Sequence, residues 1–466
     1  MRRLTPLVVA PLLLAATACS GASTPTSRAP NSSAASPSAS SSPGTTLAWE
    51  RTDLKPVTRP VAAAGRLLLY VQDGSHLSVV ALDPATGKTV WTEQATDSGI
   101  TGGVAFGLTV VKDRVVFLTP TGDGARALAA AADAATGKRL WTNDVPALYR
   151  DAPSECSDDK TQVCAIGSIK GRSGVLRLAL DDGTLRLKPQ SGPDLRAMGA
   201  ELQDTGERKP DYIARVTPAG RQVWKRPLAQ MFGADVSSDT GWNWDVIGGT
   251  IVGSMGLRRD ASSDEYLLGA AVLVAIDKAT GRTLWRVPQR ELHCYGTMDE
   301  VLGTDDTLPF RCAYTGVIRL SAGRETKSSG ATAVVEGFDP KTGRTTWRVD
   351  VGAAPALALD DPAPMGLGGS VVVVPRLEGP PLRIDLRTGA HADVVEPVDG
   401  WCAQQNPYSI TASIHTGGRQ GQTLLEPCRS DGRKVFAPEK VTDEFGTKAG
   451  GHLVWAARDG VHAVKA

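Results

Sequence analysis

A nine-residue pattern, Asp-x-x-Thr-Gly-basic-x-x-Trp, occurs four times in this chain and constrains its fold more than any other feature. The copies span Asp83–Trp91, Asp133–Trp141, Asp277–Trp285 and Asp339–Trp347. Alternating residues lead into the first copy, its Thr-Gly pair can close a turn, and a short run ending in Trp follows, which is the sequence of a β-hairpin. The chain is therefore predicted to consist of repeated hairpins.

Each recurring position of the pattern has a physical role. The Asp side chain can accept hydrogen bonds from the backbone amides of the turn, and the Gly supplies the left-handed conformation that closes a hairpin loop with a bulge. The Trp combines a large apolar surface with one N–H donor, which suits a residue wedged between two packed sheets. We expect twelve positions to be structural in this way: Asp83, Gly87, Trp91, Asp133, Gly137, Trp141, Asp277, Gly281, Trp285, Asp339, Gly343 and Trp347.

Weaker copies of the turn extend the repeat along the chain. A four-stranded antiparallel sheet with its turns takes about 40 to 50 residues, which is the period of a propeller blade. We expect loop insertions at residues 258–265 and 304–329 to account for the two longest intervals. The turn glycines, 37 to 62 residues apart, are Gly87, Gly137, Gly183, Gly220, Gly281, Gly343, Gly389 and Gly432.

The two ends of the chain predict how the repeat array closes. Trp49 looks like the end of a repeat's last strand, while residues 452–464 look like the strands that precede a turn. Pairing of these N- and C-terminal strands would complete the last blade and remove unpaired sheet edges. The predicted fold is all-β: a β-propeller of four-stranded antiparallel blades, with eight blades and with seven or nine as alternatives. Because eight turns plus a split blade would make nine, one weak copy, Gly183 or Gly220, is expected not to head its own blade.

The segment Ala-x-Asp-x-x-Thr-Gly-Lys-x-x-Trp at residues 81–91 resembles the tryptophan-docking repeat of the pyrroloquinoline quinone (PQQ) propeller superfamily. The resemblance covers roughly residues 47–466, which we take as one propeller domain. Within that group, an exported lipid-anchored propeller is similar in layout to the non-enzymatic lipoprotein scaffold of the outer-membrane protein assembly machine. The superfamily also includes dehydrogenases that hold PQQ and Ca²⁺ on the propeller axis beside an adjacent cysteine pair. This chain has no Cys-Cys, so neither PQQ nor Ca²⁺ is expected as a cofactor.

The first 19 residues resemble a bacterial lipoprotein signal peptide. Two arginines precede an apolar run at residues 7–18, which is too short to span a bilayer as a helix. The run ends in a sequence similar to the lipobox of bacterial lipoproteins, so we expect lipidation of Cys19, with ordinary cleavage as the alternative. Residues 20–46, nearly all Ser, Ala, Pro, Thr and Gly, are predicted to be a disordered tether. The protein is thus expected to be exported and lipid-anchored to the outer face of the bacterial cell membrane.

The remaining six cysteines lie in sequence-local pairs. Six cysteines permit 15 pairings, and locality favours one of them. Disulfides suit an exported protein, and no Cys-x-x-Cys is present to indicate a zinc site or a redox motif. The predicted disulfides are Cys156–Cys164, Cys294–Cys312 and Cys402–Cys428.

The charge balance and the motifs favour binding over catalysis. The chain has 51 basic and 50 acidic residues, which gives no electrostatic basis for binding nucleic acid. Its six histidines show no metal-ligand spacing, and no Gly-x-Ser-x-Gly elbow presents a nucleophile. The run from Thr86 to Thr89 resembles the tail of a phosphate-binding loop, but Leu82 stands where that loop has glycine. We therefore predict no enzyme activity and no metal site.

One aromatic cluster is a candidate ligand contact. Trp242 and Trp244 are one residue apart, so on a strand they point to the same face and could stack on a sugar or grip a protein. Packing inside the fold is the alternative. The predicted function is a membrane-tethered, extracytoplasmic, non-catalytic scaffold that binds a protein or a cell-envelope ligand. Two alternatives remain: a PQQ-dependent dehydrogenase-like quinoprotein and a cell-wall glycan-binding module.

Overall fold

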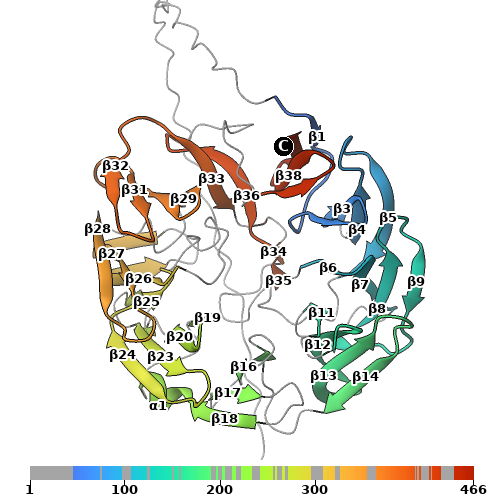
Figure 1. Ribbon diagram of the computed structural model, residues 1–466, viewed down its shortest axis with the longest axis horizontal. Helices are drawn as coiled ribbons and strands as arrows, with labels where there is room; N and C mark the ends of the chain where they lie inside the picture. Colours follow the sequence, from blue (N-terminus) through green and yellow to red (C-terminus); the bar gives the residue numbers. More distant parts are fainter. Residues whose placement is uncertain are drawn as a thin grey trace, which may run out of the picture. The chain divides into compact units, whose positions relative to one another are not determined.

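Eight antiparallel β-sheets of four or more strands make up the part of the chain that the computed structural model describes (Figure 1). The described residues are 46–466 with gaps, the longest of which are 97–106, 205–211, 234–241, 295–307, 354–363, 411–418 and 432–444. The predicted architecture, a propeller of four-stranded antiparallel blades, is confirmed. We number the blades one to eight, beginning with the first complete sheet after the N-terminus.

Blades one to four follow one another in sequence order. Blade one holds β2 (Val61–Ala63), β3 (Arg66–Asp73), β4 (His76–Leu82) and β5 (Thr89–Ala95). Blade two holds β6 (Thr109–Val111), β7 (Arg114–Pro120), β8 (Ala127–Asp133) and β9 (Arg139–Thr142). Blade three holds β10 (Leu148–Tyr149), β11 (Ser154–Glu155), β12 (Gln162–Ile169), β13 (Arg172–Ala179) and β14 (Leu185–Pro189). Blade four holds β15 (Arg196–Ala197), β16 (Leu202–Asp204), β17 (Tyr212–Val216) and β18 (Gln222–Pro227), and a short helix, α1 (Leu228–Phe232), follows it.

Blades five to eight carry the additions to the basic repeat. Blade five holds β19 (Trp242–Ile247), β20 (Thr250–Met255), β23 (Val272–Asp277) and β24 (Thr283–Pro288). Blade six holds β25 (Glu291–Leu292), β26 (Phe310–Leu320), β27 (Thr326–Phe338) and β28 (Thr345–Ala353), with β21 (Arg258–Arg259) and β22 (Glu265–Leu267) added. Blade seven holds β29 (Met365–Gly368), β30 (Val371–Val374), β31 (Leu382–Asp385) and β32 (His391–Asp393), extended by β33 (Asp399–Gln404) and β36 (Leu424–Arg429). Blade eight holds β37 (Thr447–Ala449), β38 (His452–Ala457), β39 (Gly460–Lys465) and β1 (Trp49–Arg51), and a two-stranded sheet pairs β34 (Ser409–Ile410) with β35 (Arg419–Gln420).

Both faces of a blade are buried, which explains why its strands are apolar on both sides. On β4, Val79 and Ala81 pack in one hydrophobic cluster with residues of blade two. The alternate residues Val80 and Leu82 pack in another cluster with blade eight. Because successive side chains of a strand point to opposite faces, each blade is held by both of its neighbours.

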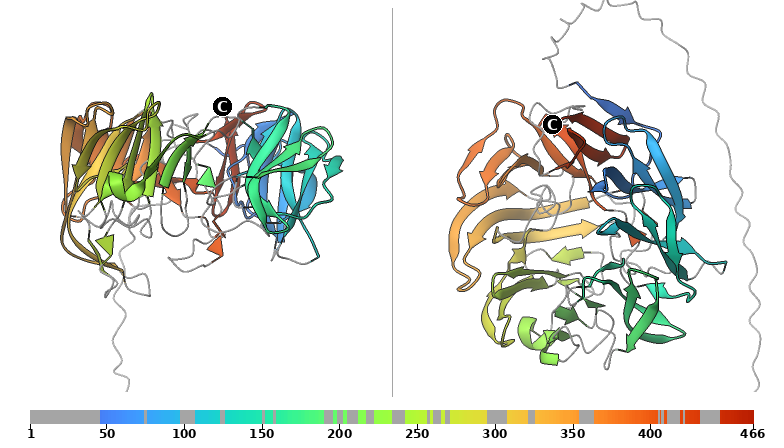
Figure 2. Two further views of the ribbon diagram at one scale, coloured as in Figure 1. Left: turned by 90° about the horizontal axis from the view of Figure 1, so that it is seen from below. Right: turned by 45° about the vertical axis from the view of Figure 1, so that its right-hand side comes forward.

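The N-terminal strand completes the last blade. β1 pairs with β39, with Trp49 opposite Ala463 and Arg51 opposite Val461. Figures 1 and 2 show β1 beside the C-terminal strands. The predicted pairing of the N- and C-terminal strands is therefore confirmed.

The blade count shows which weak repeat copy does not head a blade. Gly183 lies in the turn between β13 and β14 of blade three, and β17 and β18, which flank Gly220, belong to blade four. The prediction that one of these two copies lacks its own blade is therefore wrong. The extra copy is the last one: Gly432 itself lies outside the described residues, but β36 before it joins the sheet of blade seven through β33. The strand that precedes this copy, β36, therefore extends the sheet of blade seven and does not begin a further blade.

In their described residues, the two insertions predicted to be loops instead contain strands that pair with each other. β22, in the insertion of blade five, pairs with β26, so that Glu265 lies opposite Arg319 and Leu267 opposite Val317. β26 and β27 continue as a ladder through this second insertion. The sequence periods marked the two segments as extra but could not show that they pair across blades.

Among the described residues, no helix is long and apolar enough to cross a membrane.

Candidate functional site

The four full copies of the repeat turn share one hydrogen-bonding scheme. In the first, Asp83 Oδ1 accepts hydrogen bonds from the Thr86 N–H at 2.9 Å, the Thr86 hydroxyl at 2.9 Å and the Ala85 N–H at 3.1 Å. These bonds, led by that from the Thr86 side chain, hold the pKa of Asp83 below its ordinary value. Gly87 adopts φ 68°, and the strand register shifts between Ala81 and Leu82, which is the expected bulge. The Asp carboxylates of these turns are thus occupied in holding the chain.

The repeat tryptophans join neighbouring blades at six of the junctions in the described part of the ring. The ring of Trp91 lies against Gly137 of blade two, where a Cβ atom would come within 2.6 Å of Cγ of the indole. The indole N–H donates to Ala134 O at 3.1 Å. The same arrangement joins Trp49 to Gly87, Trp141 to Gly183, Trp224 to Gly281 and Trp285 to Gly343, and Trp347 packs on Gly389. The structure therefore places all twelve motif residues at contacts within or between blades.

Other residues singled out in the sequence lie partly outside the description. Cys19 and residues 20–45 of the proposed tether are outside the described residues. The backbone of Trp242 and Trp244 belongs to β19, which is the edge strand of blade five opposite β24, but their side chains are outside the description.

The structure contains the three predicted disulfides. Their Cα–Cα distances are 5.0 Å for Cys156–Cys164, 4.8 Å for Cys294–Cys312 and 5.8 Å for Cys402–Cys428. Disulfides are typical of proteins in an oxidising, extracytoplasmic compartment. The paired cysteines are 8, 18 and 26 residues apart, so none of these disulfides supplies the adjacent cysteine pair of the quinone-dependent dehydrogenases. The residues present do not fit PQQ in that respect.

A buried ion network stabilises blade six. Glu336, 1% exposed, accepts hydrogen bonds from Arg290 at 2.9 and 3.0 Å and from Arg311 at 3.0 Å. Burial opposes ionisation of Glu336, but the hydrogen bonds and charges of the two arginines outweigh it and lower its pKa. Burial lowers the pKa of Arg311, although Glu336 works against this shift. Arg311 also donates to Gly343 O at 3.2 Å, so the network supports a repeat turn. In the described part of the chain, no three His, Cys, Asp or Glu residues are placed to hold a metal ion.

The hairpin of β33 and β36, which we call the inner hairpin, fills the space between blades seven and eight (Figure 1). It continues the sheet of blade seven beyond β29, and the Cys402–Cys428 disulfide joins its two strands. Its connecting loop is bonded to the entry of blade one: Asn406 Nδ2 donates to Val57 O at 2.9 Å, and the Gln422 N–H donates to the same oxygen at 2.9 Å. The inner hairpin therefore links blades seven and one across blade eight.

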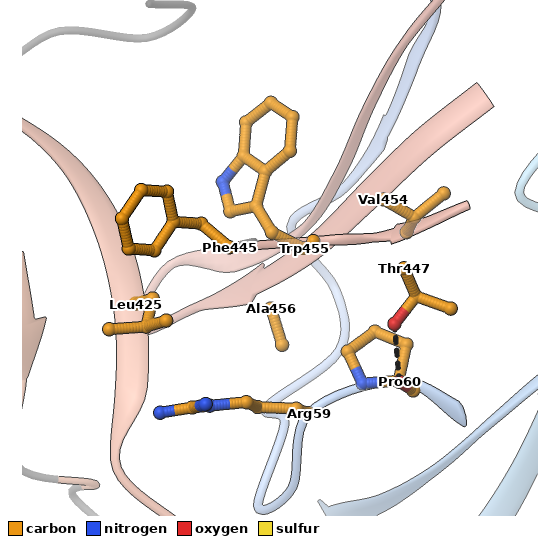
Figure 3. A pocket seen from close by; sticks show the side chains of 9 residues that line it. Arg59, Pro60, Leu425, Phe445, Thr447, Val454, Trp455 and Ala456 are labelled. Atoms are coloured by element: carbon orange, nitrogen blue, oxygen red, sulfur yellow. Dashed lines mark hydrogen bonds between the residues drawn. The ribbon is translucent and has the colours of Figure 1, made fainter. Parts of the chain in front are cut away.

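A pocket of about 140 Å³ lies between the inner hairpin, blade eight and the segment that enters blade one (Figure 3). Three regions of the described chain line it: Arg59 and Pro60; Leu425; and Phe445, Gly446, Thr447, Val454, Trp455 and Ala456. The Thr447 hydroxyl donates to Pro60 O at 2.6 Å, and Arg59 Nε donates to Thr423 O at 3.0 Å. These bonds join the lining regions to one another, so the fold itself holds the walls of the pocket in place.

Aromatic rings back the upper wall of the pocket. Trp401 stacks on Phe445 with centroids 5.5 Å apart and meets Trp455 edge to face at 5.4 Å. Trp455 in turn stacks on His462 at 5.6 Å. Trp401 and Trp455 are 1% and 2% exposed, so the rings make a rigid wall rather than a surface.

A second surface feature, which we call the blade-seven patch, consists of Leu377 and Val395. They are 53% and 82% exposed, the two highest values among the large apolar side chains of the described residues. Both lie at the same end of the sheet, because Leu377 is in the β30–β31 loop and Val395 follows β32, whose Asp393 pairs with Leu382. Arg376 holds this end in place by donating to Pro380 O at 2.6 Å and to Asp393 at 2.7 Å. The patch is therefore exposed and also fixed.

Neither surface was predicted from the sequence. Arg59, Leu425 and Trp455 come from segments far apart in the chain, and no local motif marks them. One signal was present: the stretch between Gly389 and the terminal strands is longer than a turn requires and holds a cysteine pair.

Comparison with protein-family models assigns the chain to one family. A family model described as "Outer membrane protein assembly factor BamB" matches residues 38–197 and 209–393, more than half of the chain. No sequence among the curated proteins matches significantly.

Three solved structures resemble the fold at low identity. BamB from Moraxella catarrhalis is 14% identical, the match covering 88% of this chain and 99% of that one, with a TM-score of 0.40. The quinohemoprotein alcohol dehydrogenase ADHIIG from Pseudomonas putida HK5 is 13% identical, covering 85% and 78%, with a TM-score of 0.40. A europium-containing methanol dehydrogenase is 13% identical, covering 82% and 84%, with a TM-score of 0.38.

Proposed function

The chain belongs to the family described as outer membrane protein assembly factor BamB, and from that premise we propose that it is a non-catalytic scaffold that binds another protein outside the cytoplasm. In this proposal a lipid on Cys19 and the tether of residues 20–46 hold the propeller at the outer face of the cell membrane. The repeat motif builds the ring, and the partner binds to surfaces that the repeat leaves exposed. No cofactor takes part.

The observation that carries the proposal is the blade-seven patch. Exposed apolar side chains that cluster on a fixed surface mark sites of protein contact. Arg376 fixes the patch before any partner arrives, so little conformational entropy is lost on binding. The apolar residues Val90 and Leu140 on the outer strands are less exposed, at 43% and 42%, and serve as a comparison.

The charges around the patch indicate the chemistry of the partner. Glu378 and Glu396, the residues that follow Leu377 and Val395, are both exposed. A partner segment with an apolar residue beside a basic one would bury its apolar side chain on the patch and place its charge near these carboxylates. Charge complementarity of this kind raises the association rate, and this effect decreases as the salt concentration rises.

Site-specific photo-crosslinking in cells tests the proposal. A photoreactive amino acid is placed at position 377 or 395 of the full chain and, as matched controls, at the exposed apolar positions Val90 and Leu140. We expect a discrete protein adduct from positions 377 and 395 and none from the controls. If all four positions gave the same pattern, or if neither patch position gave an adduct, the blade-seven patch would not be the protein-binding surface and the proposal would lose its support.

A further inference from the structure

The main chain of β32, at the outer edge of blade seven, has hydrogen-bonding groups that face away from its sheet (Figure 1). The carbonyl of Ala390 accepts a hydrogen bond from the last residue of β31 at 2.8 Å, and the N–H of Val394 donates to the residue just before β31 at 2.8 Å. Because consecutive residues of a strand direct their N–H and C=O groups to opposite sides, His391 and Asp393 face the other way. In the described part of the chain, no strand pairs with β32 on that side.

β32 is also more exposed than the outer strands of other blades. All of its residues, His391–Asp393, are exposed. The outer strands β5, β9, β18, β24 and β28 each include buried or half-buried residues, the repeat tryptophan among them. β32 has Asp393 at the position of that tryptophan. An exposed edge strand with unpaired main-chain groups is a template on which another chain can add a strand.

The edge of β32 runs directly into the blade-seven patch. Val395, 82% exposed, lies two residues beyond the end of β32, and Leu377 lies at the same end of the sheet. Glu378 and Glu396, each next to one of these apolar residues, are exposed and negatively charged. A segment that paired with the edge would therefore have an apolar side chain at the patch and a neighbouring side chain near a carboxylate.

We infer that the partner of the blade-seven patch binds as an added β-strand along the edge of β32. The main chain of the partner pairs with His391 and Asp393, one apolar side chain lies on the patch, and a basic side chain beside it lies near the two glutamates. In strand addition the main-chain hydrogen bonds supply affinity and the side chains supply specificity. The inference rests on the proposed function, because it states how the partner binds to the same surface.

Residue-resolved hydrogen exchange of the full chain in detergent tests the inference with a synthetic peptide, acetyl-Lys-Val-Thr-Val-Thr-Val-Lys-amide. The peptide favours an extended conformation and has a basic residue beside an apolar one at both ends, so it can pair in either direction. We expect a dissociation constant of about 1 mM. At about ten times that concentration, exchange of the His391 and Asp393 amides should slow about tenfold, because about nine-tenths of the protein is then bound. The Ala392 amide, which already faces β31, should not change.

Two proline variants locate the pairing. His391→Pro removes an outward N–H and no hydrogen bond to β31, so it should weaken binding of the labelled peptide, measured by fluorescence anisotropy, at least about tenfold. Thr92→Pro is the matched control, because by the same alternation the N–H of Thr92 on β5 also faces away from its sheet. It should leave binding unchanged. The melting temperatures of both variants are compared with that of the wild type to check the fold.

Four results would overturn the inference. They are peptide binding without protection of His391 and Asp393, equal protection of the amides of β5 and β9, no binding at about 10 mM peptide, and protection that grows with protein concentration without peptide, since the edge would then pair with a second copy. The photo-crosslinking experiment separates this inference from the scaffold role. Protection without an adduct from position 377 or 395 would support strand addition and count against the scaffold role, and an adduct without protection would do the reverse.

Discussion

The contact between a repeat tryptophan and the turn glycine of the next blade predicts a specific coupling between two substitutions. Gly137 has φ 72°, and a Cβ atom there would lie 2.6 Å from Cγ and 2.7 Å from Cδ2 of Trp91. Gly137→Ala should therefore carry two costs: about 1–2 kcal/mol for a left-handed alanine and about 1–3 kcal/mol for overcrowding. Trp91→Ala removes the second cost, because the ring is gone. We expect Gly137→Ala to be less destabilising in the Trp91→Ala background than alone by about 1–3 kcal/mol.

A matched control isolates the backbone cost. Gly65 has φ 71° and no atom within 4 Å of an added Cβ, so Gly65→Ala should cost only about 1–2 kcal/mol, with or without Trp91. The four variants of the cycle and the control are compared by urea unfolding of the full chain, with disulfides oxidised and far-UV circular dichroism as the signal. Comparable m-values are required, because a change in m would mean that the surface exposed on unfolding has changed or that unfolding is not two-state. If the cycle were additive within about 0.5 kcal/mol, or if Gly137→Ala cost no more than Gly65→Ala, the tryptophan would not be docked as described.

Three further predictions concern the ion network, the repeat turns and the anchor. Glu336→Gln leaves Arg311 buried without its carboxylate and should cost about 3–5 kcal/mol in urea unfolding, against less than about 1 kcal/mol for Asp53→Asn in the exposed Arg51–Asp53 pair; equal costs would contradict the buried network. The pKa values of Asp83, Asp133 and Asp277 are lowered by hydrogen bonds in the folded state, so their contribution is full above the unfolded pKa of about 4 and is lost as pH falls below it. The triple Asp→Asn variant should therefore show a smaller fall in melting temperature between pH 5 and pH 2.5 than the wild type, and an unchanged fall would contradict this account. Cys19→Ala should move the protein from the detergent phase to the aqueous phase in Triton X-114 partitioning, while a serine substitution in the tether should not; retention in the detergent phase would contradict lipid anchoring.

The sequence predicted the features that are local and repeated. The turn at Asp83, its bulge and the role of Trp91 each depend on residues within one hairpin and its neighbour, so a short pattern contains them. The disulfides could be predicted for the same reason, because each joins cysteines at most 26 residues apart.

The features that the sequence did not predict are those that depend on contacts between blades. The pairing of Glu265 with Arg319 joins two insertions that the sequence shows as unrelated polar segments. The pocket brings Arg59 beside Leu425 through hydrogen bonds to Gln422 and Thr423, more than 360 residues away in the chain. No periodicity reports such contacts, because the segments that make them are the departures from the repeat.

Both surfaces of interest lie where the repeat cannot continue. In the full copies a Trp stands four residues after the turn glycine, but four residues after Gly389 the chain has Asp393. Blade eight obtains its outer strand from the N-terminus, so it has no turn between β39 and β1 that could receive a tryptophan from blade seven. The position is thereby released from packing, and Asp393 instead binds Arg376 and fixes the blade-seven patch. The inner hairpin fills the same junction between blades seven and eight and forms the pocket with blade eight. In this chain the ring closes by pairing of β39 with β1, and at this junction substitutions can serve binding without weakening a docking contact.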